Sequence, residues 1–536
     1  MEENSTIIQP QTNDKLKLDF KRTLKVGFAF LGIMLFWEVY DYIMPLILSN
    51  YFGLSTSEYG IIMGLDNLLS IFLLPFFGSL SDKAVTGKYG RRTSFIFWGS
   101  IAAAVSVVFL MIMEFLQYRQ IMGTALADIQ NIIDVANKTN VELSSTDKAT
   151  IEGLISQLVA NGYVSSEFVS NAFASNPDFI QAVTTIQTQV ARNVMSTNPT
   201  YLVLFILALL FILVSMASYR SPAIALMPDV TPKPLRSQAN ALITLMGGIG
   251  GALSIIVYKI FGAKKYESHI ALWAVTAGLL LIILVLYLVF VREKKFVQLR
   301  EEEEKRYGVI DEEEEDAKHG INKLPKEKFI SLLLILGTVF LWFFGYNCVR
   351  SHMSVYSTQY LGFDQGFVGT INLFNGIGGA VALIPCAFLA NKIGRKKTIF
   401  VGLIIAILTY IPSFFMTKYT PGVKVWFPLC FILSGFGMVF VNVNTLPMVT
   451  ELSKGSNVGK YTGYYYVASM TAQAVTPYFA GLFMKIDGLA TYKYLFVYAM
   501  VFIILAMVTT AFIKYGDVKA EKARGIVDII NQDGAD

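Results

Sequence analysis

Long apolar stretches with few charged residues divide this chain of 536 residues. About 20 apolar residues in a helix are enough to cross the roughly 30 Å hydrocarbon core of a bilayer. The composition agrees, because 15% of the residues are charged against about 25% in soluble domains. The sequence therefore predicts an all-α membrane protein. The twelve spans that we expect run near 24–49, 59–80, 93–117, 200–222, 237–262, 270–291, 329–354, 366–388, 398–417, 426–449, 461–484 and 492–514.

The placement of lysine and arginine sets the expected orientation. If the N-terminus is cytoplasmic, most of the 44 Lys and Arg residues lie in segments on the cytoplasmic side, as the positive-inside rule requires. The first 23 residues are polar, and the first apolar run is too long for a cleavable signal peptide. We therefore expect a multi-pass protein of the cell membrane with both termini in the cytoplasm. The net charge of +5 then reflects topology and not a nucleic-acid partner.

The chain divides into two halves of six spans. Residues 24–292 form the expected N-terminal half and 329–514 the C-terminal half, between cytoplasmic tails at 1–23 and 515–536. The joining segment 293–328 alternates blocks of acidic and basic residues, which is typical of a solvated linker or a short exposed helix.

An insertion at 118–199 separates spans 3 and 4 and is expected to face outside. It is polar, contains no spanning run, and includes stretches with the apolar spacing of helices. We expect a small extracellular helical cap of about 80 residues. Such a cap could filter the substrate or bind a partner, or it could be an insertion that the fold tolerates without a role.

One glycine-rich basic motif occurs twice, about half a chain apart and each time at the end of an apolar span. An apolar helix, a tight basic loop and another apolar helix, repeated, indicate a carrier built from two similar halves. The first copy contains Gly78, Asp82, Gly90, Arg91 and Arg92, and the second contains Gly394, Arg395 and Lys396. This pattern resembles the loop motif of the major facilitator superfamily.

The resemblance implies a twelve-helix fold that transports a solute by alternating access, without enzymatic activity or a cofactor. In that family the motif latches the outward-facing state. The first copy has three extra residues, which brings it closer to the branch of glycoside–cation and sucrose-type symporters. The second copy has Asn391 where the family often has aspartate, so its ionic latch is in question.

Acidic residues inside the spans are the strongest functional signal. A charge in the bilayer is costly, so it usually faces a cavity and has a function. Glu38 and Asp41 lie three residues apart, and therefore on one face of span 1, while Asp66 lies in span 2 at a similar depth. Clustered carboxylates in such a site can exchange protons, so we expect cation coupling at Asp66, Glu38 and Asp41. The alternative is that one or two of them simply pair with Arg350 or another buried cation.

The same resemblance bears on the coupling ion and on Arg220. Sodium-coupled relatives typically carry a second aspartate one turn after the first, where this chain has Ser70, and span 4 contains no acidic residue. Both differences favour H⁺ over Na⁺. In the sucrose-type branch an arginine of span 4 handles sugar or protons, and Arg220 matches it; alternatively, Arg220 anchors the membrane face. Pro222 and Pro228 should bend or end that helix.

Amides and aromatic rings within the spans suit a polyhydroxylated solute, since amides bond hydroxyls and rings stack on C–H faces. For each such residue the alternative is a role in helix packing. Glycine clusters at 247–251 and 376–379 could give the two halves smooth faces to rock on, or serve ordinary close packing. The substrate-binding candidates are Arg220, Asn67, Trp37, Tyr346, Asn347, Arg350, Asn372, Asn375, Asn442 and Gln473.

Other chemistry finds little support. The three cysteines and three histidines are scattered, so we expect neither a metal site nor disulfides. No nucleotide-binding loop is present. We expect a monomeric, H⁺-coupled symporter of a sugar or glycoside in the bilayer. An H⁺-coupled exporter of drugs or metabolites, and a receptor that does not transport, are the alternatives.

Overall fold

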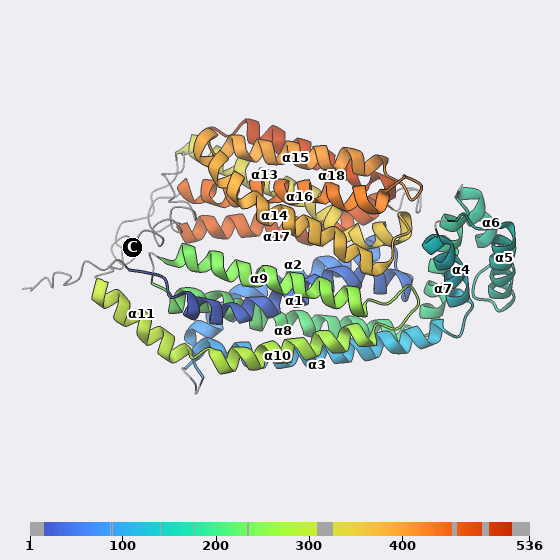
Figure 1. Ribbon diagram of the computed structural model, residues 1–536, viewed down its shortest axis with the longest axis horizontal. Helices are drawn as coiled ribbons and strands as arrows, with labels where there is room; N and C mark the ends of the chain where they lie inside the picture. Colours follow the sequence, from blue (N-terminus) through green and yellow to red (C-terminus); the bar gives the residue numbers. More distant parts are fainter. Residues whose placement is uncertain are drawn as a thin grey trace, which may run out of the picture.

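The computed structural model describes residues 16–307, 325–452, 458–484 and 492–516, apart from 86, 88, 140, 177, 233 and 234. Long helices run side by side along the length of the molecule, with a group of short helices at one end (Figure 1). We call the end that carries the short helices the cap end, and the opposite end, where the repeated motif lies, the motif end. The part of the chain that the structure describes contains helices and no strands.

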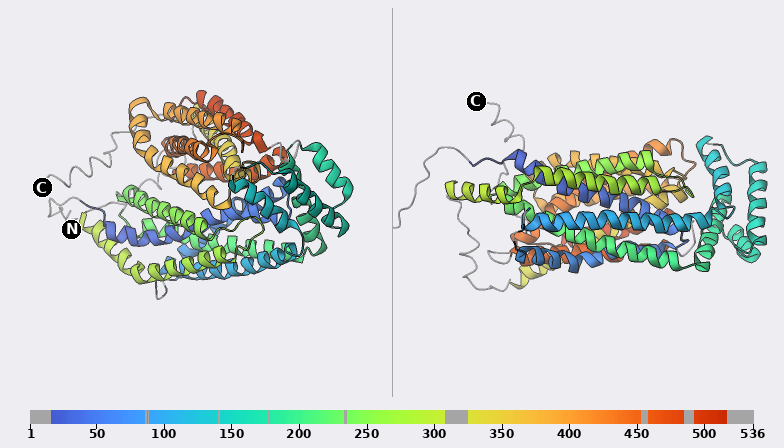
Figure 2. Two further views of the ribbon diagram at one scale, coloured as in Figure 1. Left: turned by 45° about the vertical axis from the view of Figure 1, so that its right-hand side comes forward. Right: turned by 90° about the horizontal axis from the view of Figure 1, so that it is seen from below.

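Six long helices form the N-terminal half. Each is apolar along most of its length, and α3 (Arg91–Ile121) packs along α8 (Thr200–Val230), while α1 (Phe20–Asn50) packs along α9 (Arg236–Phe261). A shorter helix, α11 (Glu293–Tyr307), follows α10 at the motif end (Figure 2). The other long helices of this half are α2 (Thr56–Lys83) and α10 (Ile270–Phe290).

The C-terminal half repeats this arrangement. Its first helix continues into a π-helical turn, η2 (Tyr356–Tyr360), at the cap end. The helices of this half are α13 (Lys326–Val355), α14 (Gln365–Ile393), α15 (Arg395–Phe415), α16 (Val423–Glu451), α17 (Val458–Met484) and α18 (Leu495–Ala511).

The all-helical membrane fold predicted from hydropathy is confirmed. Among the described residues, eleven helices are long and apolar enough to cross a membrane. The twelfth expected span is α17, which is 27 residues long but is rich in tyrosine, threonine and glycine, so it falls outside this set. The helix α8 continues through Pro222 and ends at Val230, so only Pro228 lies near a helix end.

The insertion between α3 and α8 is helical. Its four helices stand beyond the ends of the long helices (Figure 1). A buried apolar face of α7, including Ile186 and Val190, packs toward α1 and α3. We call this group the cap; it consists of α4 (Leu126–Thr139), α5 (Ser145–Ala160), α6 (Ser166–Ser175) and α7 (Phe179–Thr197).

Close contacts join the two halves at the cap end. The backbones of α2 and α17 touch there, because Gly64 lies directly against the carbonyl of Ala474 and leaves no room for a Cβ atom. Thr56 Oγ1 donates to the carbonyl of Gly481 over 2.7 Å. Gln359 Nε2 lies 3.1 Å from Ser49 Oγ at the same end. Toward the motif end the helices of the two halves diverge (Figure 2).

The two glycine clusters pack within their own halves. A Cβ atom at Gly250 would collide with the carbonyl of Leu31 on α1, and one at Gly378 with the carbonyl of Ile432 on α16. The helices that carry these clusters, α9 and α14, do meet between the halves, but Gly250 and Gly378 face α1 and α16 within their own halves. Their physical role is close approach of neighbouring helices inside each half.

Candidate functional site

A group of charged side chains lies in the middle of the bundle. Glu38 and Asp41 project from α1, and both contact Arg350 of α13 in the other half: Arg350 Nη2 lies 3.1 Å from Glu38 Oε1 and 2.8 Å from Asp41 Oδ2. The Arg350 side chain is 35% exposed, so it remains accessible to solvent. Glu38 and Asp41 therefore both pair with Arg350, and their part in cation coupling stays a prediction.

Asp66 on α2 stands apart from this pairing. Its carboxylate accepts a hydrogen bond from Asn67 Nδ2 over 2.8 Å and interacts electrostatically with Asp41 and with Arg220 of α8. Within the described part of the chain, neither Asp66 nor Arg220 forms an ion pair within 4 Å. The cluster thus contains three acidic and two basic side chains, with the unpaired carboxylate and the unpaired guanidinium near each other.

The polar and aromatic candidates of the C-terminal half differ in how freely they face this space. Trp342 Nε1 donates to Asn442 Oδ1 over 3.0 Å, and its ring stacks on Tyr346. Asn347 Nδ2 donates to the backbone carbonyl of Gln473, whose own amide bonds to Ser469. Asn442, Asn347 and Gln473 are thus engaged in contacts between or within helices.

Three candidates keep polar groups available. Asn372 is only partly buried and has no hydrogen bond to another described residue, while Asn375 contacts the hydroxyl of Tyr346. The buried indole N–H of Trp37 has no partner among the described residues. These side chains come from α14 and α1, which belong to opposite halves.

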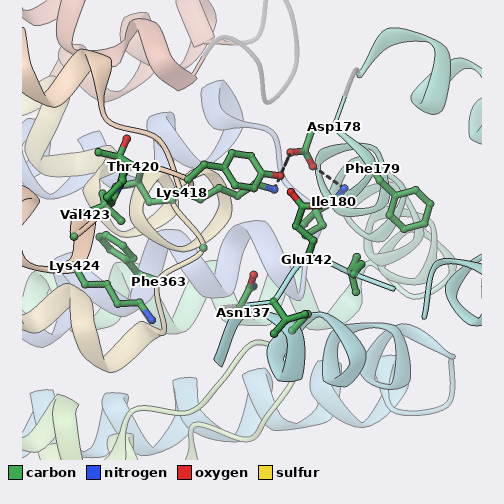
Figure 3. Close-up of a pocket in the computed structure, with 18 of the residues that line it drawn as sticks. Asn137, Glu142, Asp178, Phe179, Ile180, Phe363, Lys418, Thr420, Val423 and Lys424 are labelled. Carbon is green, nitrogen blue, oxygen red and sulfur yellow. Dashed lines mark hydrogen bonds and ion pairs between the residues drawn. The ribbon is translucent and has the colours of Figure 1, made fainter. Parts of the chain in front are cut away.

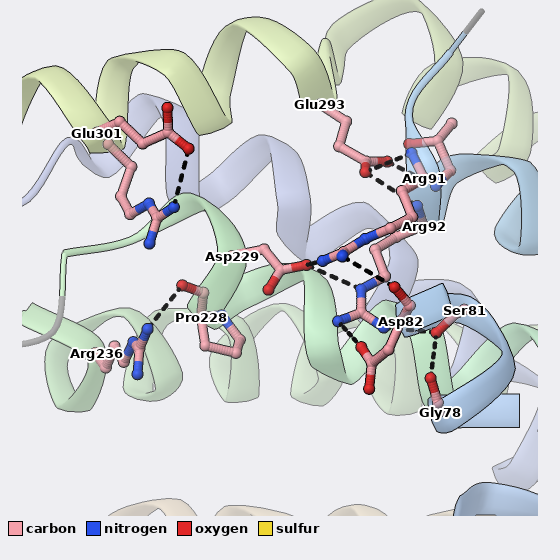
Figure 4. A network of polar contacts seen from close by, with 12 residues as sticks. Gly78, Ser81, Asp82, Arg91, Arg92, Pro228, Asp229, Arg236, Glu293 and Glu301 are labelled. Carbon is pink, nitrogen blue, oxygen red and sulfur yellow. Dashed lines mark hydrogen bonds and ion pairs between the residues drawn. The ribbon is translucent and has the colours of Figure 1, made fainter. Parts of the chain in front are cut away.

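The first copy of the motif builds a network of charges at the motif end (Figure 4). Arg92 is the centre: Nη2 lies 2.5 Å from Asp82 Oδ1, Nε lies 2.9 Å from Asp229 Oδ2, and Nη1 donates to Ser81 Oγ. Arg91 Nη2 also reaches Asp229, at 3.1 Å. The network therefore ties the ends of α2, α3 and α8 together.

Glu293, the first residue of α11, completes this network. Its carboxylate accepts the backbone N–H groups of Arg91, Arg92 and Thr93 at 2.7, 2.9 and 2.7 Å, which are the amides that a helix N-terminus leaves unpaired. Gly90 has a φ of +128° and no room for a Cβ atom beside Glu293. The glycine of the motif is thus required for the close approach of this carboxylate.

The second copy of the motif is built in a similar way with a different acid. Arg395 pairs with Glu451 at the end of α16, as Arg91 and Arg92 pair with Asp229 at the end of α8. Lys396 Nζ donates to the carbonyls of Ala511 and Ile513 over 2.9 and 2.7 Å. The side chain of Asn391 lies outside the described residues, and Glu451 supplies an acidic partner for the second copy.

The comparisons with known proteins agree with this architecture. The sequence model of the Major Facilitator Superfamily matches residues 182–446 and 358–527. The chain belongs to this superfamily. No curated protein matches the sequence significantly.

Solved structures of facilitator proteins share the fold. A D-xylose–proton symporter is 13% identical, with a TM-score of 0.56 over 93% of this chain and 98% of the other. The inward-open xylose transporter XylE from E. coli is also 13% identical, with a TM-score of 0.56 over 96% and 98%. A bacterial homologue of the iron transporter ferroportin, in an inward-facing state, is 12% identical, with a TM-score of 0.53 over 93% and 99%. At these identities the likeness establishes the fold and leaves the solute open.

Three acids of this facilitator's loop networks were missed from sequence. Asp229 and Glu451 each follow an apolar span, and Glu293 is the first residue of the charged linker. In sequence, none of them can be distinguished from an ordinary charged residue at a membrane face. A signal was present in their placement, since Asp229 and Glu451 both end the fourth long helix of a half. Comparing the two halves position by position would have paired them with the two motif copies.

Proposed function

We propose that this secondary transporter is an H⁺-coupled symporter of a sugar or glycoside, with the cap outside the cell and the motif end in the cytoplasm. Asp66 carries the proton. The supporting observation is that the three acids of the central cluster differ in their ion pairs. Glu38 and Asp41 both pair with Arg350, whereas Asp66 has no ion pair among the described residues. A buried carboxylate without a paired cation avoids the cost of its charge by taking up a proton.

The central ion pairs also support alternating access. Arg350 belongs to one half and its two acidic partners to the other, so these ion pairs join the halves across the solute space. The polar contacts of Thr56 and Gln359 close the cap end. In the orientation that we propose, the closed cap end is the external end of the carrier, and proton and solute exchange with the cytoplasm at the motif end.

A sugar fits the groups that line the space between the halves. The free indole N–H of Trp37 and the amides of Asn372 and Asn375 can bond hydroxyls, and the Tyr346 ring offers a face for C–H groups. The similarity in fold to a D-xylose–proton symporter supports this proposal. Arg220 lies close enough to Asp66 to sense its charge, and therefore links the proton site to the solute site.

The test is a paired transport assay on Asp66→Asn in proteoliposomes. A panel of labelled sugars is first screened with an imposed pH gradient, and then with a Na⁺ gradient in its place. With a transported sugar, we expect Asp66→Asn to lose uphill uptake while counterflow, with equal sugar on both sides and no gradient, survives. Asp128→Asn, at an exposed aspartate of the cap, is the control and should retain both activities. Uphill uptake at the wild-type level in Asp66→Asn would exclude Asp66 as the coupling residue.

A further inference from the structure

The cap is fastened to the N-terminal half by several contacts. Arg192 of α7 pairs with Glu58 of α2 at 2.6 Å. Lys265, in the loop between α9 and α10, donates to Gln187 of α7 over 2.9 Å. Gly53, with a φ of +62°, lies flush against the backbone of α7 at Arg192, where any side chain would collide. The cap therefore moves with the N-terminal half as one body.

A second contact reaches from the cap to the C-terminal half. Asp178 caps α7, and its Oδ1 accepts the N–H groups of Ile180 and Gln181 at 2.8 and 3.3 Å. Its Oδ2 lies 2.8 Å from Lys418 Nζ and accepts the hydroxyl of Tyr419 at 3.1 Å. Lys418 and Tyr419 belong to the loop between α15 and α16, and Figure 3 shows Lys418 next to Asp178. We call these three residues the cap bridge.

Both charged side chains of the bridge are largely shielded from solvent. The Lys418 side chain is 16% exposed and that of Asp178 is 20% exposed. Burial raises the pKa of Asp178, but the hydrogen bond and the charge of Lys418 outweigh burial and leave the pKa below its ordinary value. The carboxylate is therefore ionised at neutral pH, as an ion pair requires.

A cavity beside the bridge separates the cap from the C-terminal half. It measures about 860 Å³ and is lined by Asn137 and Glu142 on the cap side and by Phe363 and Lys424 on the other (Figure 3). Beside this open space the two bodies meet at the bridge, and α7 also touches η2. A contact of this kind can break without exposing much apolar surface.

We propose that the cap bridge is a latch that holds the external end of the carrier closed and sets how often it opens. The inference rests on the proposed alternating access, because the outward-open state must separate the C-terminal half from the N-terminal half and its cap. Each opening then breaks the contacts of Asp178 with Lys418 and Tyr419. The cap is then part of the external gate: it is attached to the N-terminal half, and the cap bridge connects it to the C-terminal half when the gate is closed.

The test measures opening without substrate or proton gradient. A single cysteine replaces Ser57, which is 5% exposed at the cap end of α2, in a protein whose native cysteines are replaced. The rate of its alkylation by a maleimide in nanodiscs reports the open fraction. An ion pair near the surface shifts such an equilibrium by about two- to five-fold. We expect Asp178→Lys and Lys418→Asp each to speed alkylation by that factor, Tyr419→Phe to act less, and the double charge swap to return the rate toward wild type.

The control is Lys424→Asp, a lysine that lines the same cavity and lies outside the bridge; its rate should stay at the wild-type value. Size-exclusion profiles and melting temperatures establish that each variant is folded. Unchanged rates in both single reversals, or a double swap that stays as fast as the single variants, would overturn the latch. If Ser57→Cys is never alkylated in the otherwise wild-type protein, opening of the cap end itself fails, which separates an error in the proposed transport cycle from an error in the latch.

Discussion

At the scale of single residues, Lys265 is a charged side chain buried at the interface between the cap and the long helices. Burial lowers the pKa of its ammonium group to about 8, and the nearby Asp134 carboxylate opposes that shift. The ammonium donates to Gln187 and lies 5.2 Å from the centre of the Tyr266 ring. The hydrogen bond to Gln187 helps to hold the cap against the long helices, but burying the charged ammonium group costs folding free energy.

This cost predicts how stability depends on pH. Between about pH 8 and the unfolded pKa near 10.5, the unfolded chain binds more protons than the folded one, so stability rises with pH in that window. A shift of this size corresponds to at most about 3 kcal/mol. We expect Lys265→Met to remove the rise, and to unfold at pH 7 no more easily than wild type. Melting temperatures from pH 7 to 10 measure this.

Lys264→Met is the matched control, because the Lys264 side chain is 61% exposed and should leave the rise intact. A rise that persists in Lys265→Met would assign the pH dependence to other groups. A marked loss of stability at pH 7 would mean that the hydrogen bond to Gln187 and the attraction to Asp134 outweigh the cost of burial.

The central acids show what sequence can and cannot supply at this scale. Glu38, Asp41 and Asp66 could be identified as functional candidates from the sequence alone, because a charge inside a bilayer is costly. How Arg350 is shared is not encoded locally, because it lies about 310 positions from its partners. Its pairing with Glu38 and Asp41 was only one of two alternatives, and the choice between them depends on how α13 meets α1.

At the scale of elements, the N-terminus of α3 depends on a distant acid. Three first-turn amides bond the Glu293 carboxylate, which is 4% exposed. We expect Gly90→Ala to be strongly destabilising, by about 2–4 kcal/mol, since it adds strain at positive φ and displaces this cap. Glu293→Gln keeps an acceptor but loses the charge at the helix N-terminus, and should cost about 1 kcal/mol.

The comparison is made by melting temperature in detergent. Gly87→Ala is the control in the same loop, where a new Cβ atom would meet Ser94 Oγ at 3.3 Å and the Gly90 carbonyl oxygen at 3.9 Å, so its effect should be small. If Gly90→Ala and Gly87→Ala have the same melting temperature, the motif glycine Gly90 is not needed for the approach of Glu293.

The elements themselves were largely predictable. Hydropathy located the spans because the bilayer demands about 20 apolar residues from each of them. Hydropathy could not place the helix ends, since α2 and α14 extend beyond their apolar cores to Lys83 and Ile393, where the ends are fixed by loop contacts. The sequence left two roles open for the glycine clusters, a surface for rocking or ordinary close packing, because the partners of Gly250 and Gly378, α1 and α16, are unknown until the helices are packed.

At the scale of the whole molecule, the arrangement of two halves and a cap gives each end a different task. The cap end holds the contacts between the halves and the cap bridge, and the motif end holds the two charged loop networks. The sequence predicted the division into halves through its repeated motif. It could not predict that the cap reaches the second half, because Asp178 and Lys418 lie 240 positions apart and meet only when both halves are assembled.

The orientation of this assembly in the membrane is the last prediction. Lysine and arginine gather at the motif end, and the positive-inside rule places that end in the cytoplasm. Single cysteines at Ala149 on α5 and at Glu302 on α11, both exposed, report the two ends in a protein lacking Cys348, Cys386 and Cys430. In intact cells, an impermeant maleimide should label Ala149→Cys, and it should label Glu302→Cys only after permeabilisation. The reverse pattern would put the cap in the cytoplasm, and the cap bridge would then govern the inner gate of the carrier instead of the outer one.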